Sequence, residues 1–152
     1  MAEYLANAVQ PVLLNQAALF DASIPCNRGY VFHEDGTGIF ILRGIVNNPS
    51  CNRARYQVIA RGNIAIPTGG TVGPVAMALS VNGETRPTSR SIVTPAAVEE
   101  YGNFTSSAII DVPRGCCFTV SLRSVAASDD PTVVPAPVIN LQNASVEITR
   151  IA

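Results

Sequence analysis

Residues 53–83 read RARYQVIARGNIAIPTGGTVGPVAMALSVNG, and two runs within them alternate between apolar and polar or small side chains. The apolar face of the first run carries Ala54, Tyr56, Val58 and Ala60. The corresponding face of the second run carries Val75, Met77, Leu79 and Val81. Side chains of a strand point alternately to its two faces, so this period of two predicts two long, half-buried strands. Asn82-Gly83 then supplies the two residues with positive φ that a tight hairpin turn requires.

Turn signals divide the rest of the chain into further short strands. We expect strands at about 4–9, 12–20, 30–33, 39–42, 84–93, 104–112, 116–123 and 143–151. Residues 1–20 form N-terminal strands or an arm, because Pro11 argues against a continuous helix. Residues 126–137 hold three prolines and an acidic pair and form a surface loop. The sequence therefore predicts one all-β domain over residues 1–152, with about ten short antiparallel strands and no long helix.

The charge composition points to a covered surface. The chain has ten arginines and no lysine, and charged residues make up 14% of it, against roughly 25% in an average domain. Lysine is depleted from protein interfaces and arginine is enriched there, so we expect contacts with copies of the chain or with a partner. A biased genome composition is the alternative explanation.

Several classes of partner do not fit the sequence. The formal net charge of −1 provides no basic field for nucleic acid. No apolar run approaches the ~20 residues of a membrane span. The first residues lack the basic start and apolar stretch of a secretory signal, so we expect synthesis in the cytoplasm.

The four cysteines are Cys26, Cys51, Cys116 and Cys117, and no pair has the spacing of a zinc or redox motif. We expect buried, structural thiols, because a protein made in the cytoplasm keeps its thiols reduced. A disulfide between Cys26 and Cys51, formed after release from the cell, is the alternative.

No constellation of catalytic or metal-binding residues is evident. His33 is the single histidine, and beside two acidic residues at a turn it is expected to be solvated. A histidine-based metal site in an all-β fold would need two or three histidines. Cys117 and His33 could form a nucleophile–base pair, but neither lies in a sequence signature of a cysteine enzyme family. The acidic pairs 99–100 and 129–130 lack calcium-site spacing, and the glycines of 68–71 lack the lysine of a phosphate loop. We expect no catalytic residue, metal or cofactor.

Several segments resemble the jelly roll of the tumour necrosis factor and complement globular-head superfamily. They are a long strand beginning Arg55-Tyr56, a partner ending Val81-Asn82-Gly83, the segment Asp111-Val112-Pro113-Arg114-Gly115 before Phe118-Thr119-Val120, and a terminal strand over 144–151. The runs 66–75 and 94–97 look like small proteins of Gram-positive gut bacteria and their prophages. The resemblance covers about residues 28–151 and implies a jelly-roll sandwich that forms trimers, with one sheet of each subunit around the three-fold axis. The cysteines, the lack of tryptophan and the loop 126–137 depart from the family pattern.

Residues 39–42 are apolar on both faces, and a strand of this kind needs cover on both sides. We expect a second copy to provide it in a closed ring. The candidate interface residues are Phe40, Ile41, Tyr56, Phe104, Ile110 and Ile148.

Together these patterns predict a non-enzymatic structural protein of a virion, namely a trimeric phage capsid decoration or head-fibre protein seated on the major capsid protein. The alternative is a trimeric surface binding module whose loops recognise a glycan or a host protein.

Overall fold

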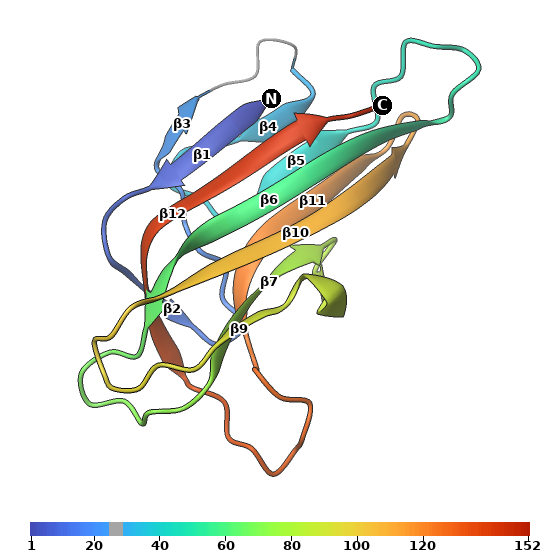
Figure 1. The fold of residues 1–152 in the computed structure, drawn as a ribbon. Coiled ribbons are helices and arrows are strands. Elements are labelled where there is room, and N and C mark those ends of the chain that lie inside the picture. The colour runs from blue at the N-terminus through green and yellow to red at the C-terminus, as the bar shows by residue number, and fades with distance from the viewer. Residues whose placement is uncertain (25–28) are drawn as a thin grey trace.

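The computed structural model describes residues 1–24 and 29–152 and contains two antiparallel sheets packed face to face (Figure 1). Sheet A consists of β10 (Gly102–Pro113), β6 (Arg53–Ala65), β12 (Val138–Arg150), β1 (Ala2–Ala6) and β3 (Ala22–Ile24), with β2 (Gln10–Leu13) on β12. Sheet B consists of β4 (Val31–His33), β5 (Phe40–Arg43), β11 (Cys117–Val125), β7 (Val75–Val81) and β8 (Glu84–Thr85), with β9 (Ser91–Val93) on β7. The predicted all-β sandwich is confirmed.

The only helical element among the described residues is the 3₁₀ turn η1 (Pro87–Ser89). Within the same part of the chain, no helix is long and apolar enough to cross a membrane.

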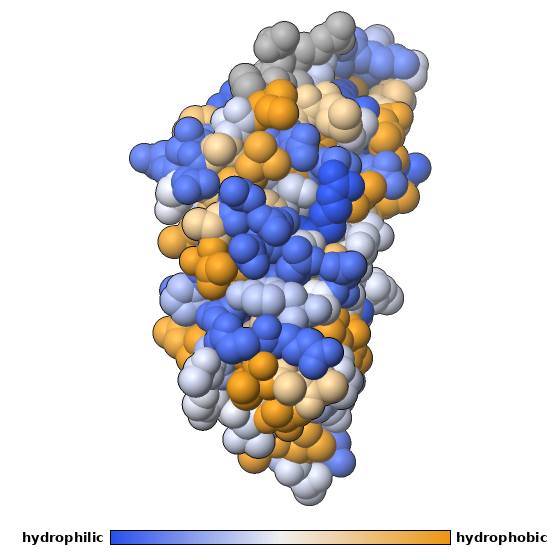
Figure 2. Space-filling model, turned by 60° about the vertical axis from the view of Figure 1, so that its left-hand side comes forward, coloured by the Kyte–Doolittle hydropathy of each residue, from blue (hydrophilic) through white to orange (hydrophobic). Residues whose placement is uncertain are grey.

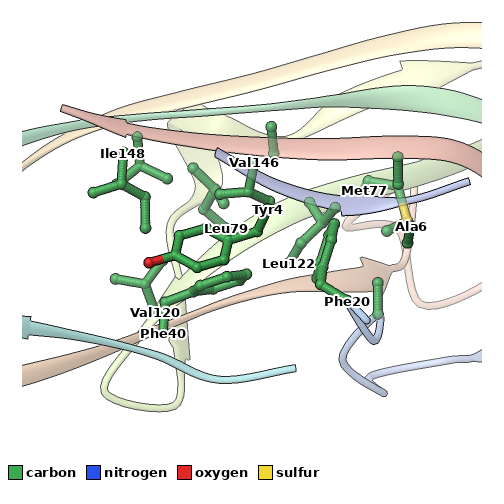
Figure 3. Close-up of a cluster of buried hydrophobic side chains, with 14 of the residues drawn as sticks. Tyr4, Ala6, Phe20, Phe40, Met77, Leu79, Val120, Leu122, Val146 and Ile148 are labelled. Atoms are coloured by element: carbon green, nitrogen blue, oxygen red, sulfur yellow. The ribbon is translucent and has the colours of Figure 1, made fainter. Parts of the chain in front are cut away.

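The core lies between the inner faces of the two sheets (Figure 3). The predicted alternation in β6 is confirmed, because Ala54, Tyr56, Val58 and Ala60 are fully buried while the residues between them point outward. Aromatic rings gather at one place in this core. The ring of Phe40 lies 4.7 Å from that of Tyr4 and 5.4 Å from that of Phe20, at the tilted angles that aromatic pairs prefer.

The hairpin after β7 is confirmed. Asn82 and Gly83 both have positive φ, of 52° and 86°, as a tight turn between twisted strands requires. The Asn82 side chain adds a tie to the neighbouring strand, because its Oδ1 accepts a hydrogen bond from the Thr119 amide at 3.0 Å.

A bulge in β12 explains one glycine of β6. The register between β12 and β6 shifts between Gln142 and Ser145, and Asn143 there has a φ of 53°. The chain then passes so close to Gly62 that a Cβ atom would lie 3.1 Å from Ala144 Cα and 3.1 Å from the Phe104 ring. Glycine therefore permits the close approach of two backbones at this point.

Three predicted elements have different boundaries. The N-terminal strands are β1 and β2, whereas residues 14–20 contribute only isolated bridges at Ala17 and Phe20. The last strand begins at Val138, five residues before the expected start. The expected strand 84–93 is interrupted by η1, because Ser89 Oγ accepts a hydrogen bond from the Leu79 amide at 2.9 Å and occupies the place of a strand partner. Side-chain bonding of this kind competes with a regular ladder.

Candidate interaction surface

Five of the six candidate interface residues lie in the core of a single chain. Phe40, Tyr56, Phe104, Ile110 and Ile148 are at most 2% exposed. Their own sandwich covers them, since they occupy the inward positions of alternating strands. The interpretation that their apolar character requires a neighbouring subunit is therefore corrected.

Ile41 is the one candidate that points outward. Around it, on the outer face of β4 and β5, the cross-strand partner Phe32 is 49% exposed and Ile39 is 51% exposed. The sequence correctly marked residues 39–42 as apolar on two faces, because Phe40 and Leu42 fill the core while the two isoleucines stay on the surface. We call Phe32, Ile39 and Ile41 the β4–β5 strip.

The outer face of sheet A is broader and differs in chemistry. Besides charged side chains, its cross-strand rows contain uncharged polar residues and several apolar ones, among them Leu5, Ile24, Ile59 and Ile109. Ile24 and Ile109 are 57% and 54% exposed, so these apolar groups are not covered by their own chain. Figure 2 shows one flank of the molecule, where hydrophilic side chains occupy the middle and hydrophobic ones are scattered around them.

All six charged side chains that the structure describes on this outer face belong to ion pairs. Asp111 on β10 accepts two hydrogen bonds from Arg55 on β6, at 2.7 and 3.0 Å, and Arg53 lies 3.7 Å away. Arg61 donates to Glu147 at 2.8 Å and lies 3.9 Å from Glu3. Three arginines thus face three carboxylates.

The Asp111 pair shows the electrostatic effect of this arrangement. Hydrogen bonding to Arg55 is the main cause that lowers the pKa of Asp111 below its ordinary value, and the charges of Arg55 and Arg53 add to it. The same hydrogen bond raises the pKa of Arg55. Because these charges have partners on their own chain, another chain could bury this face without leaving an unpaired charge.

His33 was expected to lie in solvent, but its ring packs against other aromatic rings. Its ring stacks on Phe40 with centroids 4.4 Å apart and meets Tyr4 edge-on at 4.8 Å. Nδ1 lies 3.0 Å from the carbonyl oxygen of Ile39, and Nε2 lies 3.1 Å from that of Phe20. With both nitrogens at backbone carbonyls, the ring links the segments around Phe20 and Ile39. The prediction of a solvated turn residue was wrong, since alternation turns His33 toward the core.

The predicted burial of the cysteines is also wrong for the described part of the chain, where Cys51, Cys116 and Cys117 are exposed and free. Cys51 lies in a loop, Cys116 lies in a turn, and Cys117 begins β11 on its outward side. Cys26 and the alternative Cys26–Cys51 disulfide fall outside the described residues. No group of three or more His, Cys, Asp or Glu among the residues with described positions could hold a metal ion.

A hollow of about 470 Å³ lies between the loop 66–74 and residues 134–138. Its walls are mostly proline, glycine, valine and threonine, with Ile66 and Ala136, and Val134 is 88% exposed. Glu99 fixes one wall, because its Oε1 accepts hydrogen bonds from the amide and the hydroxyl of Thr68 at 2.9 and 3.0 Å. None of the described residues that line this hollow is aromatic, so they offer no ring surface on which a sugar could stack.

No protein-family model matches the chain, and no curated protein matches it. Several solved structures, however, are similar to the chain in fold. The globular domain of the zebrafish complement 1qA protein is 11% identical, with a TM-score of 0.64 over 99% of this chain and 97% of the other.

Two further structures agree. Eiger TNF from S. frugiperda is 11% identical, with a TM-score of 0.61 over 100% of this chain and 92% of that one. Murine APRIL is 11% identical, with a TM-score of 0.53 over 96% of this chain and 97% of the other. At such identity the likeness concerns fold alone, and it covers the whole chain: the protein has the jelly-roll fold of the complement and tumour necrosis factor globular heads.

Proposed function

We propose that the protein is a non-enzymatic structural protein that acts as a homotrimer, with the outer face of sheet A as the contact between subunits. The observation that carries this proposal is the internal pairing of every charged side chain described on that face. Burying a charge is costly when its partner is missing, so a face that neutralises itself is a favourable surface for a second copy.

Three further features support self-association. The face spans five strands and exposes Ile24 and Ile109 beside polar, uncharged residues. The absence of lysine from the chain is typical of interface-rich surfaces. The superfamily resemblance implies trimers in which one sheet of each subunit surrounds the axis. An assembly of this kind would bury roughly 2,000 Å² or more in total.

The finer proposal is that the trimer is a capsid decoration or head-fibre protein of a phage, attached to the major capsid protein in the virion. It rests on the sequence resemblance to prophage proteins and on the scarcity of catalytic side chains. The β4–β5 strip, on the sheet opposite the proposed subunit contact, offers an apolar surface for such attachment.

A binding module is the second candidate, favoured by the hollow between residues 66–74 and 134–138. Its apolar walls fit a protein segment with small apolar side chains better than a glycan. Loss of ligand capture after Val134→Asp, with the assembly intact, would support this function over a purely structural one.

The decisive experiment measures molar mass by light scattering on purified variants. Ile109→Glu places an unpaired carboxylate on the outer face of sheet A and should convert a trimer of ~48 kDa, three times the 16.0 kDa chain, to monomer. Ile41→Glu makes the same change on sheet B and serves as the matched variant. Retention of the trimer by Ile109→Glu and dissociation by Ile41→Glu would move the interface to the β4–β5 strip. A monomeric wild-type protein at micromolar concentration would refute the proposal.

A further inference from the structure

The hollow between residues 66–74 and 134–138 is a gap between two neighbouring strands of sheet A. β6 and β12 pair in register as far as Ala65 and Asn140. Beyond these residues the two segments separate and form opposite walls of the hollow. Figure 1 shows both segments at the end of the sandwich opposite the two chain termini. The hollow therefore lies where the pairing of β6 with β12 would otherwise continue.

One wall of the hollow is an extended segment. Val134 and Ala136 each precede a proline, which restricts them to extended conformations. The Leu14 amide donates a hydrogen bond to the carbonyl oxygen of Pro137 at 3.0 Å, on the side where β2 pairs with β12. Backbone groups of an extended chain point alternately to its two sides, so those of Ala136 are directed to the other side, toward the hollow.

The backbone groups of this wall are available for pairing. In the part of the chain that the structure describes, the N–H and C=O groups of Val134 and Ala136 make no hydrogen bond. An extended segment with unpaired N–H and C=O groups is a template on which another chain can add as a strand. The wall is thus suited to bind polypeptide backbone and not only side chains.

The charges near the hollow are acidic. The loops 94–101 and 126–137 contain four carboxylates and no arginine, and the loop 66–74 is uncharged. Glu99 lies directly behind the wall, because its Oε1 accepts hydrogen bonds from Thr68, which lines the hollow. Of the four carboxylates, Asp129 is paired with Arg90. The remaining negative charge favours a partner with a basic side chain.

We propose that the hollow binds an extended, basic segment of a partner protein, which adds as a strand beside residues 134–136. Its small apolar side chains pack between the two walls, and its basic side chain lies near the acidic loops. Main-chain hydrogen bonds supply affinity in strand addition, while the pockets for side chains supply specificity. This inference rests on the binding-module candidate above and names its partner and its mode of recognition.

The test is fluorescence polarisation with the labelled peptide acetyl-Gly-Val-Arg-Val-Gly-amide. This peptide should bind the wild-type protein. The same peptide methylated on its three central backbone nitrogens cannot donate strand hydrogen bonds and should bind at least about tenfold more weakly. A peptide with glutamate in place of arginine should bind at least about threefold more weakly at low ionic strength, because salt screens exposed charges.

A matched pair of protein variants locates the binding edge. Ala136→Pro removes one backbone N–H group from the wall and keeps the segment extended, so it should weaken peptide binding about tenfold. Ala96→Pro is the control, since Ala96 also follows a proline in an exposed loop but does not line the hollow. This variant should bind the peptide as the wild-type protein does.

The outcomes separate this inference from the proposed functions. Equal binding of the methylated and unmethylated peptides overturns strand addition, even if Ala136→Pro fails to fold. If Val134→Asp still abolishes capture in that case, the binding-module function stands without it. Stronger binding of the glutamate peptide, or no binding of the parent peptide at millimolar concentrations, also overturns the inference. The trimer is judged separately by light scattering, and Ile109→Glu should bind the peptide normally because Ile109 does not line the hollow.

Discussion

The two central strands β6 and β7 are both amphipathic in sequence, yet their outward sides end up in different surroundings. Arg53, Arg55 and Gln57 on the outer side of β6 are exposed, whereas Ala76, Ala78 and Ser80 on the outer side of β7 are at most 1% exposed.

Arginines from neighbouring segments explain the burial of β7. Arg90, beside β9, has an Nη1 that donates to the carbonyl oxygen of Ala126 at 3.4 Å and to Asp129 at 3.0 Å. Because β9 and the end of β11 lie on opposite sides of β7, this side chain crosses the outer side of β7. Arg123, the register partner of Ala78, flanks it from β11. Small residues on β7 leave room for the long arginine side chains above them. Burial of this kind cannot be read from the alternation within β7, because the covering side chains come from other segments.

The largest effect should come from the inner side of β7. Leu79→Ala removes a fully buried side chain from the core and should reduce the free energy of unfolding by about 2–5 kcal/mol, as cavity-forming substitutions do. Urea unfolding followed by circular dichroism measures this change. A loss no larger than that of the outer-side substitutions that follow would contradict the expectation that the inner side of β7 contributes most to stability.

The outer sides of the two strands can then be compared directly. Ala78→Leu inserts three carbon atoms beneath the crossing arginine and should cost about 1–3 kcal/mol through overpacking. Gln57→Leu on β6 is the matched change at an exposed position and should alter stability by about 0.5 kcal/mol or less. Both are measured in an Ile109→Glu background so that subunit association does not contribute. Equal costs would contradict the proposed covering of β7.

The smallest effect should come from the Asp111 ion pair on the outer face of sheet A. Arg55 lowers the pKa of Asp111 in the folded chain below its ordinary value of 3.8, so the pair stabilises the fold above that pH. This contribution is lost as the pH falls through the lower, folded-state pKa, when the carboxylate takes up a proton. Asp111→Asn should remove this part of the pH dependence, at little cost to stability at neutral pH because the pair is exposed. Urea unfolding of both proteins across the acidic range provides the comparison, and parallel curves would contradict the assignment.

Much of the fold could be predicted from the sequence, because short-range patterns determine it. The alternation in β6 identified its buried face, and Asn82-Gly83 identified the hairpin, since both depend on backbone geometry within a few residues. The same local reasoning misplaced the start of β12, where a bulge and a long-range pairing with β2 extend the strand.

The candidate surfaces were decided by the tertiary structure. Phe40 and Ile41 are adjacent and equally apolar in sequence, but one fills the core and the other faces outward. Which apolar face belongs to the core depends on the sheet that packs against it, and that sheet is built from distant segments. The charge pairing on sheet A and the hollow between residues 66–74 and 134–138 join residues from separate segments in the same way. The sequence by itself determined which segments become strands, because periodicity is local. Only the packing of those strands decided what each face meets, because such contacts join residues far apart in the chain.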